Sequence, residues 1–152
     1  MKNRKIKIIV WIAVFLAMCF TVFGNPVVRI NNHRLKKAVT SLEAGQTVTL
    51  NEVVPFEWDA VYTFSPYTSE EEIEKIIGFK SRDIVANNVN EGMTHLIFTK
   101  GEKVQAAVLG YPSNLGYRID FFKKVSYDRK TPFTVAEKND FTELLQAEVV
   151  VD

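Results

Sequence analysis

The residues of this chain that could carry out chemistry are few and widely separated. A nucleophile needs a neighbouring base, and the candidate bases are His33 and His95, neither of which lies in a recognisable nucleophile motif. The best-placed carboxylate pair is Glu57 with Asp59, whose Cα atoms would lie about 7 Å apart along a strand. Acid/base chemistry by this pair is one hypothesis, but solvated charges on a strand surface are the favoured interpretation.

Metal and cofactor motifs are missing from the sequence. Cys19 is the single cysteine, and with two distant histidines a structural zinc site would have too few of its usual ligands. The sequence contains no Gly-rich phosphate loop, HExxH motif or EF-hand pattern. The acidic run at residues 70–72 is better explained by capping of a helix. We therefore predict no catalytic residue, no cofactor and no metal.

Binding has a better case than catalysis, because aromatic residues fall at predicted turns. Tyr67 follows Pro66 between a predicted strand and a predicted helix, and Tyr111 precedes Pro112 in a second turn. Aromatic side chains at turns can serve as contact anchors, although they can equally cover the end of a core. The candidate contact surface consists of Glu57, Asp59, Tyr67 and Tyr111.

Residues 1–24 have the composition of a segment directed to a membrane. Four basic residues precede an uncharged apolar run from Ile8 to Phe23, which predicts a cytoplasmic N-terminus and an external C-terminal part. As a helix the run would span roughly 24 Å, short of the hydrocarbon core of about 30 Å unless flanking residues extend it. We expect a single-pass anchor that contacts the lipid bilayer through residues 6–24. Cleavage near Gly24 with secretion is the alternative, and lipidation of Cys19 is a third hypothesis.

Residues 25–152 are long enough for one extracytoplasmic domain with its own core. They contain no cysteine, so the domain must be stable without disulfides, which suits an exported bacterial protein. Four of the 19 basic residues and none of the 18 acidic residues lie in the first 24 positions, so the domain is net acidic. This charge argues against nucleic acid as a partner.

Hydrophobic periodicity predicts the secondary structure of the domain. One helix is expected to start at Asn31 or Asn32 and end before Gly45, and a second to run from Thr68 or Ser69 to Gly78 with the isoleucines as its buried stripe. Strands are expected at residues 47–50, 56–64, 94–99, 103–109, 117–123 and 132–136. In the strand at 56–64, alternation places Trp58 in the core and residues 57, 59, 61 and 63 on a largely polar face. Because the strands cluster, we predict an α+β fold with one mainly antiparallel sheet and two short helices on one face.

One stretch of the domain resembles a known group of proteins. Residues 55–62 read Pro-Phe-Glu-Trp-Asp-Ala-Val-Tyr, and the pattern continues through Pro66-Tyr67 and an acidic helix to Gly78. This stretch resembles small uncharacterised exported or membrane-anchored proteins of Gram-positive bacteria, which carry a Trp-Asp-x-Val-Tyr strand and a Pro-Tyr turn before an acidic helix. The resemblance implies the exported topology and no particular activity.

Together these observations predict a non-catalytic domain, anchored in the cell membrane, that binds a protein or polymer of the bacterial cell envelope. Two alternatives stay open. The first is a secreted small hydrolase that uses Glu57 and Asp59. The second is a secreted inhibitor or immunity-like protein that acts by occluding the surface of another protein.

Overall fold

The computed structural model describes residues 6–14, 24–86 and 90–147. Residues 6–14 are helical. Within the described ranges, no helix is both long enough and apolar enough to cross a membrane. The expected anchor at residues 6–24 includes residues 15–23, and these, with Cys19 among them, lie outside the described part of the chain.

The domain has an α+β fold with mainly antiparallel strands, as predicted, but the strands form two sheets rather than one. The β3–β4 sheet has the order β4 (Lys103–Gly110), β3 (Thr94–Lys100), β2 (Ala60–Thr63) and β6 (Lys124–Ser126). The β7–β8 sheet has the order β1 (Thr47–Thr49), β7 (Pro132–Lys138), β8 (Phe141–Gln146) and β5 (Tyr117–Asp120). Strands β5 and β8 pair in parallel, whereas the other pairs are antiparallel. The predicted strand at 117–123 is shorter than expected, because the chain leaves one sheet after Asp120 and enters the other at Lys124.

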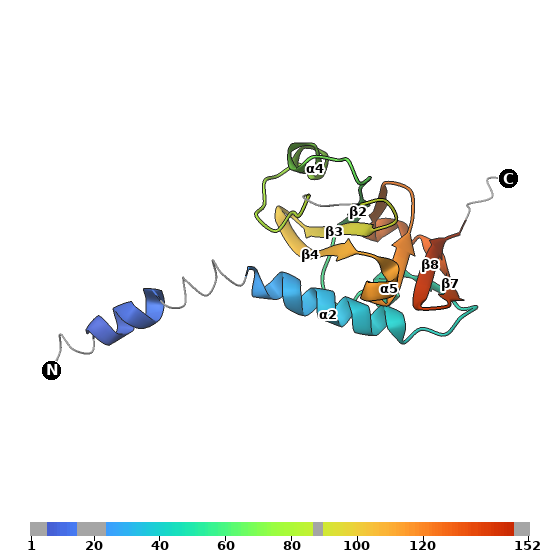
Figure 1. The fold of residues 1–152 in the computed structure, drawn as a ribbon, viewed down its shortest axis with the longest axis horizontal. Coiled ribbons are helices and arrows are strands. Elements are labelled where there is room, and N and C mark those ends of the chain that lie inside the picture. Colours follow the sequence, from blue (N-terminus) through green and yellow to red (C-terminus); the bar gives the residue numbers. More distant parts are fainter. Residues whose placement is uncertain (1–5, 15–23, 87–89, 148–152) are drawn as a thin grey trace.

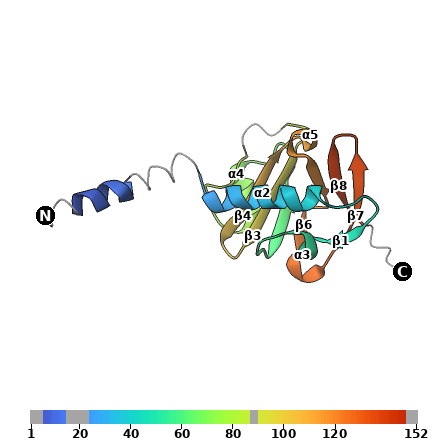
Figure 2. The ribbon, with the colours of Figure 1, turned by 90° about the horizontal axis from the view of Figure 1, so that it is seen from below.

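The longest helix of the domain, α2 (Pro26–Thr40), starts earlier than predicted. Asn25 is its N-cap, with Oδ1 accepting a hydrogen bond from the Val27 amide at 3.0 Å, and proline suits the first helical position. The expected start at Asn31 or Asn32 is wrong, because both asparagines lie inside the helix and use their side chains elsewhere. Figure 2 shows α2 lying across the strands, with the short helix α3 (Leu50–Val53) nearby.

Helix α4 (Glu70–Ile77) confirms the prediction for this segment. Ser69 caps it in a reciprocal capping box with Glu72, and Gly78 ends it in the left-handed conformation with φ of 92°. The buried stripe is narrower than expected: Ile73 is fully buried, but Ile76 is 55% exposed. Helix α5 (Pro112–Leu115) and a 3-10 turn (Tyr127–Arg129) are two further short helical elements.

The segment at 56–64 is the clearest failure of the predicted alternation. Strand β2 covers only its second half, and the irregular backbone before Ala60 shifts the side-chain pattern. Trp58 is buried as predicted, with 2% of its surface exposed, but Val61 is buried with it in the same core cluster instead of lying on a polar face. Glu57 and Asp59 are exposed, as expected.

Two hydrophobic clusters hold the domain together. The larger joins Leu35 of α2 to Phe98 of β3 and to buried residues of both sheets. The smaller joins Ile73 of α4 to Ile97 of β3. Because Ile97 and Phe98 are successive strand residues, their side chains point to opposite faces of the sheet. Helix α2 contributes Leu35 and Val39 to the larger cluster, and only Val28 in its first turn reaches the smaller one. The prediction of two helices on one face is therefore wrong, and Figure 1 shows α2 and α4 on opposite sides of the β3–β4 sheet.

Candidate functional site

A groove lies where β2, α4 and the connection from β5 to β6 meet. Its volume is about 700 Å³, and we call it the Phe122 groove. The residues that line it are Tyr62, Thr63, Phe64, Ser65, Thr68, Ile76, Asp120, Phe121, Phe122, Lys123 and Lys124. Five of these eleven residues are aromatic or aliphatic, and the other six are polar or charged. Apolar side chains beside polar groups are found in binding sites.

The backbone turn between β5 and β6 explains why Phe122 is exposed. The Lys124 amide donates a hydrogen bond to the Phe122 carbonyl at 2.6 Å, and Lys123 between them has a φ of 57°. A residue other than glycine is disfavoured in this left-handed region. The turn sends Phe121 into the core and leaves Phe122 with 77% of its surface exposed. Strained backbone of this kind tends to gather at functional sites.

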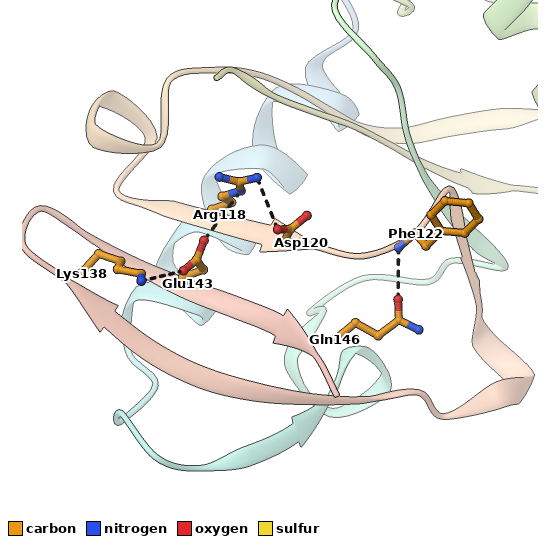
Figure 3. Close-up of polar contacts among 6 residues, drawn as sticks. All are labelled: Arg118, Asp120, Phe122, Lys138, Glu143 and Gln146. Atoms are coloured by element: carbon orange, nitrogen blue, oxygen red, sulfur yellow. Dashed lines mark hydrogen bonds and ion pairs between the residues drawn. The ribbon is translucent and has the colours of Figure 1, made fainter. Parts of the chain in front are cut away.

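The end of the parallel strand pair fixes the position of this turn. Figure 3 shows the Gln146 side chain of β8 reaching the start of the turn, where Oε1 accepts a hydrogen bond from the Phe122 amide at 3.1 Å. The buried Glu143 carboxylate of β8 lies 3.8 Å from Arg118 Nε on β5 and 3.6 Å from Lys138 Nζ on β7. The Arg118 contact joins β5 to β8 and the Lys138 contact joins β7 to β8, so Glu143 links all three strands.

The β5–β6 connection forms one side of the groove, which we call a bank, and this bank is positively charged. Lys123 Nζ lies 5.1 Å from the centre of the Phe122 ring, and Lys124 Nζ lies 5.2 Å from the centre of the Tyr62 ring. The one carboxylate of this bank, Asp120, is paired with Arg118 at 3.3 Å. The two lysine charges are therefore not cancelled by Asp120.

Helix α4 also borders the groove and contributes Ile76 to its lining, whereas its glutamates are not among the lining residues. Four glutamates and one lysine lie on this helix, and Glu70 and Glu71 are exposed. Glu72 is occupied by the cap, since its carboxylate accepts hydrogen bonds from the Ser69 amide at 3.0 Å and the Ser69 hydroxyl at 3.1 Å. These bonds lower the pKa of Glu72. The exposed Ile76 lies on the groove side of the helix.

The predicted carboxylate pair lies elsewhere, in a second hollow of about 610 Å³ beside Trp58 and Tyr127. Asp59 Oδ2 accepts a hydrogen bond from the Gly101 amide at 2.7 Å, and its Oδ1 lies 3.2 Å from Lys100 Nζ. The Gly101 bond, followed by Lys100, lowers the pKa of Asp59. Asp59 thus stabilises the turn of the β3–β4 hairpin. Its lowered pKa does not suit a general acid, which needs a raised pKa.

Neither predicted tyrosine lines the Phe122 groove, although Tyr67 falls in the sequence between two lining residues, Ser65 and Thr68. Tyr67 is 80% exposed and donates a hydrogen bond from its hydroxyl to Glu91 Oε1 at 3.2 Å. Tyr111 is the N-cap of α5 and is 39% exposed. Sequence reasoning missed Phe122, Lys123 and Lys124. The available signal was an apolar Phe122 on the otherwise polar face of the strand that contains Arg118 and Asp120.

The two histidines lie in different environments. His95 is 3% exposed, and burial lowers its pKa; its ring packs 5.4 Å from the ring of Phe64. His33 is exposed on α2. Among residues 6–14, 24–86 and 90–147, no group of three or more His, Cys, Asp or Glu side chains could hold a metal ion.

Comparison of the chain with protein-family models, with curated proteins and with solved structures gives no match. The geometry and the charges of the Phe122 groove are the features that indicate a function.

Proposed function

We propose that this protein is a non-catalytic interaction domain of the bacterial cell envelope, and that it binds its partner through the Phe122 groove. The observation that carries the proposal is the exposure of Phe122 beside an apolar groove. Single exposed apolar side chains are ordinary, but contiguous ones that rim a groove are typical of interaction sites. Here Phe122 and Ile76 are both exposed and line the same groove.

The energetics of the turn support the same proposal. Full burial of a phenylalanine side chain is worth about 1.5–3 kcal/mol relative to exposure. The left-handed Lys123 adds a cost of roughly 1–2 kcal/mol. A turn that served only to connect two strands would need neither feature. A partner that covers Phe122 would recover the first of these costs.

Attachment to the membrane is part of the proposal and follows from the sequence of residues 1–24. The charge pattern favours a cytoplasmic N-terminus, and the apolar run suits an uncleaved anchor. Helix α2 starts at Pro26, directly after this segment, and its side chains bond to β4. An anchor at residues 6–24 would therefore continue into an element that is fixed to the domain. A cleaved, secreted form is the alternative.

Two measurements test this function. The first is the intact mass of the native protein in the membrane and the culture medium: a membrane form that keeps residues 1–24 supports the tether, whereas a medium form that begins at Asn25 contradicts it. The second places a photo-reactive phenylalanine analogue at position 122 of the full chain in cells. We expect a specific protein adduct from position 122 and none from the exposed position 34 on α2. Equal labelling from both positions, or none, would contradict a role for the groove.

A further inference from the structure

We propose that helix α2 lies along the surface of the membrane in which the chain is anchored, with its outward face on the anionic headgroups of the lipids. This inference rests on the anchor at residues 6–24, which is part of the proposed function. It adds a second contact between the chain and the membrane, and it determines which way the Phe122 groove faces.

The side of α2 that faces away from the core is basic. At about 100° per residue, the buried positions 28, 31, 35 and 39 form one stripe along the helix. The basic side chains are all exposed on the other side, and the helix has no acidic residue. A basic face next to a membrane segment is complementary to anionic headgroups, because each lysine or arginine near such a surface favours binding. The basic residues are Arg29, His33, Arg34, Lys36 and Lys37.

These charges are available to a ligand. Across the described residues, no ion pair to a carboxylate uses a basic side chain of α2 from position 33 onwards. The ion pairs of the domain lie elsewhere, at Asp59, Asp120 and Glu143. The charges from His33 to Lys37 thus serve no ion pair within the domain, and an external anion can bind them.

Two exposed apolar side chains accompany the basic ones at the start of α2. Val27 is 50% exposed and Ile30 is 57% exposed. Both lie in the first two turns, at the end of the helix that follows the membrane segment. Helices that lie in a membrane interface combine basic residues with apolar side chains that enter the boundary between headgroups and acyl chains. The start of α2 has this composition.

The backbone before α2 allows the helix to lie flat on the membrane. Gly24 has a φ of 69°, in the left-handed region, and the N-cap Asn25 is extended with a ψ of 113°. A helix that ran up to Gly24 would end there, so α2 does not have to continue along the axis of the anchor. From Gly24 to Pro26 the chain spans at most about 7 Å. The start of α2 is therefore within the Debye length of about 8 Å from the end of the anchor.

This arrangement turns the Phe122 groove away from the lipid. Figure 2 shows α2 in front of the strands, at the surface of the domain. Figure 1 shows α4, which borders the groove, across the β3–β4 sheet from α2. The side chains of Asn31 and Asn32 fix α2 to β4, so the domain keeps the orientation of the helix. With α2 on the membrane, the groove is open to a partner in the cell envelope.

The test places the full chain in lipid nanodiscs that carry a paramagnetic headgroup label, which broadens the NMR signals of nearby amides. We expect discs that contain anionic phospholipid to broaden the signals of α2 severalfold more than purely zwitterionic discs do. High salt should remove the difference, because it screens the headgroup charge. The signals of α4, on the other side of the sheet, should change little. Equal broadening of α2 in the two kinds of disc would overturn the inference, as would stronger broadening of α4 than of α2.

Neutralisation of the basic face tests whether its charge is responsible. Arg34→Gln together with Lys37→Gln should weaken the surface-bound state roughly 20- to 30-fold, at about fivefold for each charge, and α2 should then be broadened as in zwitterionic discs. The matched control is Lys75→Gln with Lys80→Gln, two exposed lysines in and just after α4 that carry the same total charge. It should behave as the unaltered chain does. If the α2 variant is still broadened as strongly as the control, the anchor alone sets the distance and the inference is wrong.

An anionic polymer of the cell wall is the other ligand that a basic face could bind. If such a polymer, added in solution to zwitterionic discs, shifts the signals of α2 while anionic lipid does not broaden them, the headgroups are not the ligand and the inference fails.

The intact mass of the native protein separates this inference from the function on which it rests. A retained anchor without lipid-dependent broadening of α2 keeps the proposed function and overturns only the contact of α2. A secreted form that begins at Asn25 contradicts the anchor and the inference together. The adduct at position 122 tests the groove independently of both.

Discussion

The side chain of Asn32 pairs with the backbone of Ala107 as a neighbouring strand would. Its Nδ2 donates a hydrogen bond to the Ala107 carbonyl at 2.7 Å, and the Ala107 amide donates to its Oδ1 at 3.1 Å. Asn31 Nδ2 donates to the Gln105 carbonyl at 2.9 Å. Because β4 is the edge strand of its sheet, these contacts satisfy backbone groups that would otherwise be unpaired.

Loss of the side-chain amide of Asn32 should therefore destabilise the domain. Asn32→Ala removes both partners of Ala107, and we expect the free energy of unfolding to fall by about 1–3 kcal/mol. Urea denaturation of the full chain in micelles measures this. The control is Arg34→Ala on the exposed face of α2, which should change stability by less than about 0.5 kcal/mol. Equal effects of the two substitutions would show that the strand-like pairing contributes nothing.

Trp58 and Phe122 should respond in opposite ways to truncation. Trp58 is buried, with edge-on contacts to Phe98 at 5.9 Å and to Tyr127 at 5.3 Å between ring centres. Trp58→Ala should lower the free energy of unfolding by about 3–5 kcal/mol. Phe122→Ala removes an exposed ring, so it should leave unfolding of the isolated domain almost unchanged and reduce association. If the Trp58→Ala protein is as stable as the unaltered protein but no longer associates with its partner, Trp58 belongs to the binding site and not to the core.

Much of the fold could be predicted from local sequence signals. Ser69 and Glu72 predict the cap of α4, and Gly101 lies in the hairpin turn between two apolar segments, so both elements agree with the prediction. The start of α2 was missed for a local reason as well. Asparagine is a good N-cap at any of positions 25, 31 and 32, and only the proline at 26 distinguishes the first of them.

The candidate groove could not be predicted in the same way, because it depends on pairing between distant segments. Strands β5 and β6 are successive in the chain but belong to different sheets, and the sheet to which each belongs is decided by β8 and β2. Strand β8, which orders the turn through Gln146, was not recognised from the sequence. Asp59 was singled out for chemistry because it is a carboxylate on a strand, but its role as an acceptor for Gly101 is a tertiary contact.

Asp59 should contribute to the stability of the domain, whereas Glu57 should not. Asp59→Ala removes the acceptor of the Gly101 amide and the partner of Lys100, so we expect a lower denaturation midpoint. Glu57→Ala, two residues away and also exposed, is the matched control and should leave the midpoint unchanged. Neither Asp59→Asn nor Glu57→Gln should abolish a turnover activity found by substrate screening. If either substitution did so in a folded protein, the non-catalytic function would be wrong.

The stability of the domain should depend on pH through His95. This side chain is buried beside Phe64, and Nδ1 has no hydrogen-bond partner among the described residues. Burial lowers its pKa in the folded state below the ordinary value of 6.5, so the unfolded chain binds a proton at a higher pH than the folded chain does. Neutral His95 therefore makes its full contribution to the free energy of unfolding above pH 6.5. This contribution is lost as the pH falls towards the folded pKa, by at most about 1.4 kcal/mol per pH unit.

Replacement of His95 by an apolar ring should remove this dependence. His95→Phe keeps a ring of similar shape, eliminates the unpaired Nδ1 and has no proton to bind. We expect its free energy of unfolding, relative to that of the unaltered protein, to rise as the pH falls from 7.5 to about 5, the range in which an unfolded histidine titrates. Urea denaturation at several pH values measures the difference, and the comparison cancels the contribution of the carboxylates. His33→Gln, on the exposed face of α2, is the control and should follow the unaltered protein. If the two proteins instead differ in free energy of unfolding by the same amount over this whole pH range, His95 has the same proton affinity in the folded and unfolded chains.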